Sequence, residues 1–295
     1  MAEHSGIQSG PLPSSARLEG DPANAAHAVT AITVNARRLV LVVFLVCLTV
    51  EILLFLYDYH LHYRGVLPSA PLRRLFNMTR EDSLASWFGI MQAALVALTL
   101  WLLVWLKRHQ DMPRATIWGW LLLAAFFTYM AVDDGIVLHE RIGDAVADAF
   151  EPEEGSLTGP IAWFPSYYWQ MVFLPPLAAL GLFTLAFLWR QLPDRWSRLM
   201  VFAALSLFVL AVALDFVEGL AQEHPWNIYA WMAESDALER FARSRFDRSA
   251  FESLVHFSKS LEETLEMLAN TLLWCVFLRH LTLTVPELRL LFQRP

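Results

Sequence analysis

Acidic residues inside apolar segments are the feature of this sequence that could carry chemistry. An Asp or Glu near the centre of a membrane costs about 2.5 to 3.5 kcal/mol on insertion scales, so acids there usually mark a functional site. The apolar segments contain eight of them: Glu51, Asp133, Asp134, Asp215, Glu218, Glu262, Glu263 and Glu266. Their distances from the segment ends predict a single layer near one face of the membrane.

Helical phase, at about 100° per residue, brings histidines into the same layer. One stripe of the last segment carries His256, Glu262, Glu263 and Glu266. The sequence DDGIVLHE at 133–140 puts Asp133 and Glu140 almost in line, with His139 beside them. We therefore expect the acids of several helices to face one another.

These acids have few cationic neighbours. Arg141 and Lys259 are the only Arg or Lys residues expected in the same layer. Carboxylates so close together cannot all ionise unaided. A bound metal, a pathway for protons or ions, and a structural hydrogen-bonded network are the three interpretations that stay open.

A metal centre is the first of these interpretations. Carboxylates with imidazoles suit divalent Zn, Mn, Fe or Ca, and the number of acids suggests a dinuclear centre. The expected ligands are Glu51, Asp133, Asp134, His139, Asp215, Glu218, His256, Glu263 and Glu266. Glu140 and Glu262 are the expected catalytic residues, as unligated acids that move protons. The Glu-x-x-His signature of di-iron bundles is missing, so the identity of the metal stays open.

The composition indicates a membrane protein. Of 295 residues, 56% are hydrophobic and 17% are charged, against about 45–50% and about 25% in soluble domains. A soluble enzyme is therefore excluded. The net charge of -7, without a long basic run, argues against nucleic acid as a partner.

Six apolar segments have the length of about 18 to 24 residues that crosses the hydrocarbon. They predict an all-α, polytopic bundle of six transmembrane helices at 38–57, 86–106, 117–138, 166–189, 199–221 and 260–281. The second and fourth segments contain no acid, and we expect them at the periphery of the bundle.

The chain divides into a membrane domain and two tails. We expect a disordered cytoplasmic tail, a six-helix transmembrane domain and a short cytoplasmic C-terminal tail at 1–36, 37–285 and 286–295. Basic residues crowd the two short loops, which places these loops and both termini in the cytoplasm, as in a multi-pass inner membrane protein. The outer loops are then 58–85, 139–165 and 222–259. The last of them contains an expected amphipathic helix at the membrane interface, within 237–257.

The leading functional hypothesis is a membrane protein with a carboxylate-rich, His-assisted metal centre near the outer face. Its chemistry would act on a lipid or another apolar substrate. A cation or proton transporter that uses the acids as its pathway is the first alternative, and a non-catalytic subunit of a membrane complex is the second. The expected partners are membrane lipids and a lipid-like substrate; the sequence names no protein partner.

Overall fold

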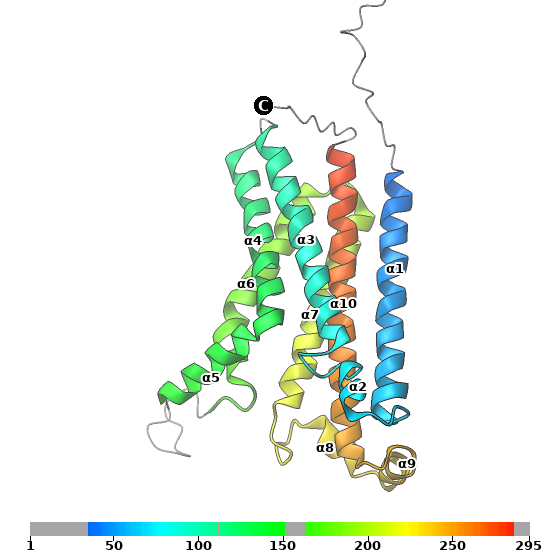
Figure 1. The fold of residues 1–295 in the computed structure, drawn as a ribbon. Helices are drawn as coiled ribbons and strands as arrows, with labels where there is room; N and C mark the ends of the chain where they lie inside the picture. The colour runs from blue at the N-terminus through cyan, green and yellow to red at the C-terminus, as the bar shows by residue number, and fades with distance from the viewer. Residues whose placement is uncertain (1–34, 111, 151–162, 286–295) are drawn as a thin grey trace, which may run out of the picture. The chain divides into compact units, whose positions relative to one another are not determined.

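The structure is a computed structural model that describes residues 35–110, 112–150 and 163–285. The predicted tails lie almost entirely outside these residues. Every regular element of the described part is a helix (Figure 1). The elements are α1 Ala36–Tyr57, η2 Asp58–Tyr63, α2 Ala70–Leu75, α3 Leu84–Arg108, α4 Arg114–Ile136, α5 Leu138–Phe150, α6 Tyr168–Gln191, α7 Arg195–Glu218, α8 Ile228–Ala233, α9 Asp236–Phe246 and α10 Ala250–Thr284.

Six helices of the described part are long and apolar enough to cross a membrane. They are α1 continued by the π-helical turn η2, and α3, α4, α6, α7 and α10. The predicted all-α bundle with six membrane-spanning helices is thus confirmed.

The centre of the bundle is α10, which packs against α1, α3 and α7 (Figure 1). Its 35 residues extend over about 52 Å at 1.5 Å per residue. Because the hydrocarbon core is about 30 Å thick, at least one end of α10 extends into the headgroup region or water. By contrast, α1 exposes Leu41, Val42 and Leu45, as expected for a helix that faces lipid.

The last span begins about ten residues earlier than predicted. Ser249 accepts a hydrogen bond from the backbone N–H of Glu252, whose side chain accepts one from the N–H of Ser249. This capping box starts α10 at Ala250. The segment 237–257 is divided between two helices, because α9 ends before Asp247, which has a left-handed backbone with φ of 56°. α9 is the amphipathic helix expected in this segment, and its place at the membrane interface stays a prediction.

The third span ends earlier than predicted, at Ile136. Val137 has a φ of 55°, a left-handed conformation that a right-handed helix cannot continue through. A new helix, α5, starts at Leu138. The predicted alignment of Asp133 with Glu140 was wrong, because it assumed one continuous helix.

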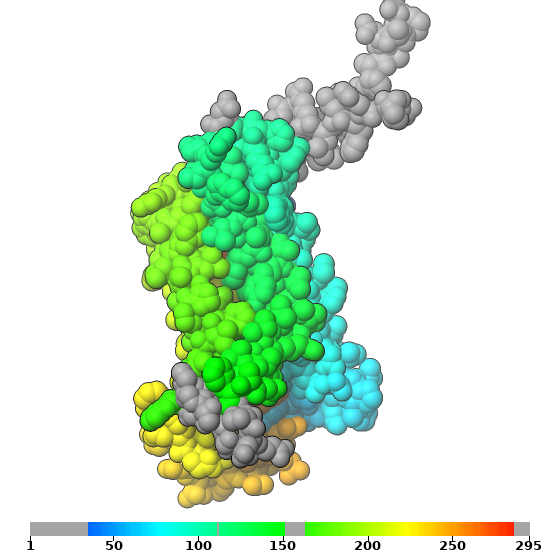
Figure 2. All heavy atoms as spheres, turned by 90° about the vertical axis from the view of Figure 1, so that its left-hand side faces the viewer, coloured from blue at the N-terminus to red at the C-terminus, as the bar shows by residue number. Residues whose placement is uncertain are grey.

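The expectation that residues 86–106 lie at the periphery was also wrong. Ala93, Val96 and Leu100 of α3 are buried, and α3 packs against both α4 and α10. Apolar packing places this helix in the core, so a lack of acids did not indicate a peripheral position. The other acid-free span, α6, packs on α5 and α7 and touches α4 through a ring contact of 5.4 Å between Phe187 and Trp120. Figure 2 shows the face on which α4 and α6 lie side by side.

Candidate metal centre

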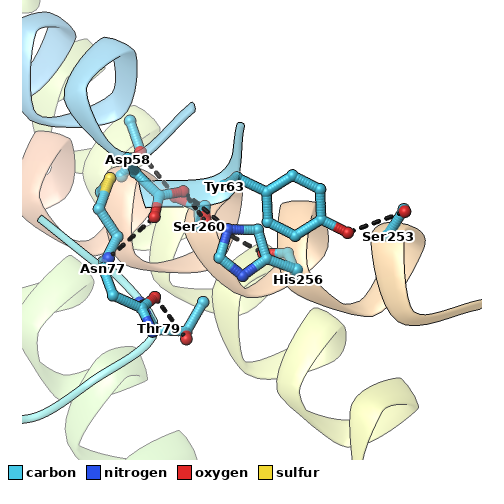
Figure 3. Close-up of polar contacts among 9 residues, drawn as sticks. Asp58, Tyr63, Asn77, Thr79, Ser253, His256 and Ser260 are labelled. Carbon is cyan, nitrogen blue, oxygen red and sulfur yellow. Dashed lines mark hydrogen bonds and ion pairs between the residues drawn. The ribbon is translucent and has the colours of Figure 1, made fainter. Parts of the chain in front are cut away.

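The carboxylate of Asp58 lies at the point where α1 passes into η2, and it is almost completely buried. Its Oδ1 accepts a hydrogen bond from the backbone N–H of Met78 at 3.2 Å. Its Oδ2 accepts one from the hydroxyl of Ser260 at 2.8 Å and lies 2.9 Å from Nε2 of His256 (Figure 3). Asp58 therefore connects the end of the first span to the last span.

His62 completes a group of three metal-ligating side chains. One ligand atom each from Asp58, His62 and His256 lies within 4.8 Å of the other two. Ligands about 2.0 to 2.1 Å from one tetrahedral ion are about 3.3 Å apart, so a small movement would fit these atoms around a single cation. The Nδ1 atom of His62 is buried and has no hydrogen-bond partner in the described structure.

Aromatic packing holds the His256 ring in place. The ring of Tyr63 stacks on it, with centroids 4.2 Å apart and an interplanar angle of 21°. The hydroxyl of Tyr63 donates to Oγ of Ser253 at 2.8 Å, one turn before His256 on α10 (Figure 3). Because the capping box starts α10 before Ser253, both residues stand on a regular helix. The ligand orientation is thus fixed by neighbours that are not ligands themselves.

Of these three residues, only His256 was expected as a ligand from the sequence. Asp58 and His62 were missed because they follow the apolar run of the first span, in a segment assigned to a loop. The spacing Asp-x-x-x-His at the end of a predicted span, in DYHLH, was the available signal.

A second group, the acidic cluster, is formed by acids of α4, α7, α10 and the loop before α3. Glu266 interacts electrostatically with Asp134, Asp215 and Glu81. Glu263 interacts with Glu266, Glu81 and Asp134. Glu262 interacts with Asp215, Glu218, Glu263 and Glu266. Acids of separate helices do lie near one another. In the described residues, however, only the Asp58 group brings three ligand atoms of Asp, Glu, His or Cys within 4.8 Å.

Several expected ligands have protein partners instead. Asp133 accepts from the backbone N–H of His139 at 2.8 Å, and its other oxygen lies 2.6 Å from Nδ1 of His139. Asp215 accepts from the side-chain amide of Gln170 at 2.7 Å. Glu218 forms an ion pair with Lys259 at 3.3 Å. These contacts compensate part of the negative charge that a metal was expected to neutralise.

Other members of the acidic cluster have no such partner. The described hydrogen bonds and ion pairs include none to the side chains of Glu81, Asp134, Glu262, Glu263 or Glu266. One oxygen of Glu262, Oε2, is also inaccessible to solvent. Glu140 is exposed on α5. The predicted roles of Asp134, Glu263 and Glu266 as ligands, and of Glu140 and Glu262 as proton carriers, stay predictions.

Glu51 lies apart from both groups. It is buried two turns before Asp58, and its Oε1 accepts from Gln92 at 2.9 Å and from Thr271 at 2.6 Å. The amide of Gln92 also donates to the Thr271 hydroxyl at 2.7 Å. This three-residue network connects α1, α3 and α10 in the interior of the bundle.

Two titratable groups on this side of the bundle lie outside the spans: His139 beside the acidic cluster and Glu81 within it. Burial lowers the pKa of His139, but its hydrogen bond to Asp133 and the nearby carboxylates outweigh this effect and raise it above the usual value. Desolvation and the neighbouring Glu140 raise the pKa of Glu81. Because both pKa values are raised, His139 and Glu81 keep their protons to a higher pH than usual.

Residues 38–281 match the family described as "Domain of unknown function (DUF8692)". The chain belongs to this family. The matched residues cover all six spans almost completely and include the Asp58 group and the acidic cluster. No curated protein and no solved structure matches the chain.

Proposed function

We propose that the protein binds one divalent metal ion through Asp58, His62 and His256 and uses it for chemistry on a lipid or another apolar substrate. The observation that carries the proposal is the convergence of these three ligand atoms to within 4.8 Å of one another. The proposed metal lies at the end of the first span and not in the acidic cluster, which is the position expected from the sequence. A single ion also replaces the expected dinuclear centre.

The donor set narrows the identity of the metal. Two imidazoles and one carboxylate suit Zn²⁺, Fe²⁺ or Mn²⁺, whereas Ca²⁺ prefers six to eight oxygen ligands. Three protein ligands leave at least one coordination position open for water or a substrate oxygen. A metal in such a site polarises the oxygen or generates a nucleophile from bound water.

The position of the group favours a substrate taken from the membrane. The first span ends at Tyr63, directly after His62, and His256 lies in the second turn of α10. The ends of membrane-spanning helices lie near the lipid headgroups. A lipid could therefore bring its polar part to the metal while its chains stay in the hydrocarbon.

Metal replacement in purified protein tests the proposal. The protein in detergent is treated with a chelator, dialysed, and then titrated with Zn²⁺, Fe²⁺, Mn²⁺ or Ca²⁺ while its melting temperature is recorded. We expect one of the first three ions to raise the melting temperature saturably and Ca²⁺ to have little effect. A melting temperature that responds to none of them would contradict the proposal.

Cation or proton transport through the acidic cluster is the second candidate. It is favoured by Asp134, Glu263 and Glu266, which come from two helices, lie near one another and have no described partner. Glu262 and Glu140 would extend this pathway. Proton flux into proteoliposomes that is lost in Glu266→Gln and retained in Asp58→Asn would favour transport over the metal centre.

We further propose that the protein lies in the inner membrane with both termini in the cytoplasm. The support is the concentration of basic residues in the short loops between α3 and α4 and between α6 and α7. A reporter fused after Pro295 should be active only in the cytoplasm. An active external reporter would reverse the orientation.

A further inference from the structure

A cavity lined by arginines lies beside the Asp58 group. It has a volume of about 400 Å³ and is lined by η2, α2, the loops that follow each of them, and the residues from the end of α9 to the start of α10. No acidic residue is among the described residues that line it. Its cationic lining consists of Arg64, Arg73, Arg74, Arg80 and Arg248. These arginines come from separate segments and therefore form no long basic run in the sequence.

The positive charge of this arginine cavity is only partly compensated. Asp82 accepts from Nε of Arg74 at 2.7 Å and from Nε of Arg80 at 2.8 Å. These two contacts lower the pKa of Asp82 to about 2, so it stays ionised and offsets one charge. In the part of the chain that the structure describes, Arg64, Arg73 and Arg248 have no ion-pair partner. This excess of positive charge stands out in a chain with a net charge of -7.

Local contacts hold the arginines around the cavity. Arg248 lies over the ring of Tyr63, 4.8 Å from its centroid. Nη1 of Arg73 donates to the backbone carbonyl of Leu67 at 3.3 Å. Gly65 has a φ of +66°, which a residue with a side chain rarely adopts, and this turn brings the loop back beside Arg73. The guanidinium groups of Arg73 and Arg248 are therefore oriented before any ligand binds.

We propose that the arginine cavity binds a phosphate group. Guanidinium groups bind phosphate oxygens through paired, charge-assisted hydrogen bonds, which suits a site with several arginines and no acid in its lining. The volume falls within the range of small-molecule sites, about 300 to 1,000 Å³. The rings of Tyr63 and Phe246 supply an apolar wall for the carbon atoms next to the phosphate. The source of the phosphate is a lipid headgroup or a soluble phosphate ester.

One residue connects this cavity to the metal centre. His62 lines the cavity and belongs to the Asp58 group. A bound phosphate would therefore lie beside the metal, which would make a phosphate-bearing molecule the substrate class; this step rests on the proposed function. Phosphate binding itself does not require the metal, so it is measured on chelator-treated protein and can succeed or fail independently.

Two probes test the proposal and distinguish the sources. Chelator-treated protein in dodecyl maltoside is titrated with inorganic phosphate by calorimetry. Protein in nanodiscs of phosphatidylcholine is compared with protein in nanodiscs that also contain phosphatidic acid, by melting temperature. Saturable binding of inorganic phosphate indicates a soluble source, and stabilisation by phosphatidic acid alone indicates a lipid source. If neither probe has an effect, the proposal is wrong.

Charge-matched variants assign the effect to the cavity. Arg248→Gln should weaken binding at least about tenfold, whereas Arg240→Gln, which removes the same charge from an exposed position on α9 outside the cavity, should change it little. Asp82→Asn should strengthen binding, because it releases Arg74 and Arg80. Misfolding of this variant would weaken phosphate binding, so it could not explain an increase in affinity. Equal losses in the two arginine variants, or no increase in Asp82→Asn, would overturn the proposal.

Discussion

Oδ2 of Asp58 lies 2.9 Å from Nε2 of His256, although 198 residues separate the two in the sequence. The contact joins the first and last membrane spans at one end of the bundle. It combines a buried carboxylate with an imidazole that the carboxylate can orient. The pair therefore has a structural role that can be measured separately from its role as a metal ligand.

Asp58→Asn should lower the free energy of unfolding of the metal-free protein by about 1 to 3 kcal/mol. The amide oxygen can still accept from Met78, but the amide nitrogen that replaces Oδ2 cannot accept from the Ser260 hydroxyl, so that hydrogen bond is lost. Thermal unfolding in detergent measures the change. Asp247→Asn is the matched control, because Asp247 is exposed and Asn tolerates its left-handed backbone equally well. A similar melting temperature for both variants would show that the Asp58 contacts contribute little.

His62→Gln should lower metal affinity more than about tenfold, as expected for the loss of one ligand. His60→Gln is the matched control, because His60 lies two residues earlier in the same helical turn but is exposed and outside the three-ligand group. Bound metal in the two variants is compared after dialysis against the same metal buffer. Equal retention by His62→Gln and His60→Gln would exclude His62 as a ligand.

Thr271→Val should destabilise the protein by about 1 to 3 kcal/mol without changing bound metal. The substitution removes a donor to the buried Glu51 and an acceptor for Gln92, and it nearly preserves the shape of the side chain. Thr49→Val serves as the control, since Thr49 is exposed and bonds only to the carbonyl of Leu45 in its own helix. Loss of metal in Thr271→Val would return Glu51 to the list of ligands.

The pair of His139 and Asp133 predicts a specific pH dependence. The pKa of His139 is raised above its usual 6.5 in the folded protein, so its contribution to stability is fully present below pH 6.5. That contribution is lost as the pH rises through the folded pKa. His139→Gln should remove this component from a plot of melting temperature against pH. A variant whose curve is parallel to that of the wild type would show that another group is responsible.

The spans and the neighbourhood of the acids could be predicted because both depend on local rules. Apolar length alone identified six helices, and depth in the membrane indicated that acids of α4, α7 and α10 lie near one another. Two predicted helix boundaries were wrong, the end of the third span and the start of the last one. The left-handed Val137 and the capping box at Ser249 each depend on a few residues that an average over a long apolar window conceals.

The two sites of greatest functional interest depend on the tertiary fold. His62 becomes a neighbour of His256 only because the end of α1 packs against the start of α10. The arginine cavity likewise combines Arg64 with Arg248, from opposite ends of the chain's membrane region. Neither juxtaposition leaves a periodic pattern in the sequence, so hydropathy and helical phase could not reveal them.

Elemental analysis of the purified protein tests the central claim most directly. Wild-type protein in detergent should contain about one equivalent of Zn, Fe or Mn per chain. His256→Gln should contain much less, whereas Glu266→Gln, which alters the acidic cluster, should retain the wild-type amount. Wild-type protein without stoichiometric metal, or metal that is lost in Glu266→Gln and kept in His256→Gln, would contradict the assignment to Asp58, His62 and His256.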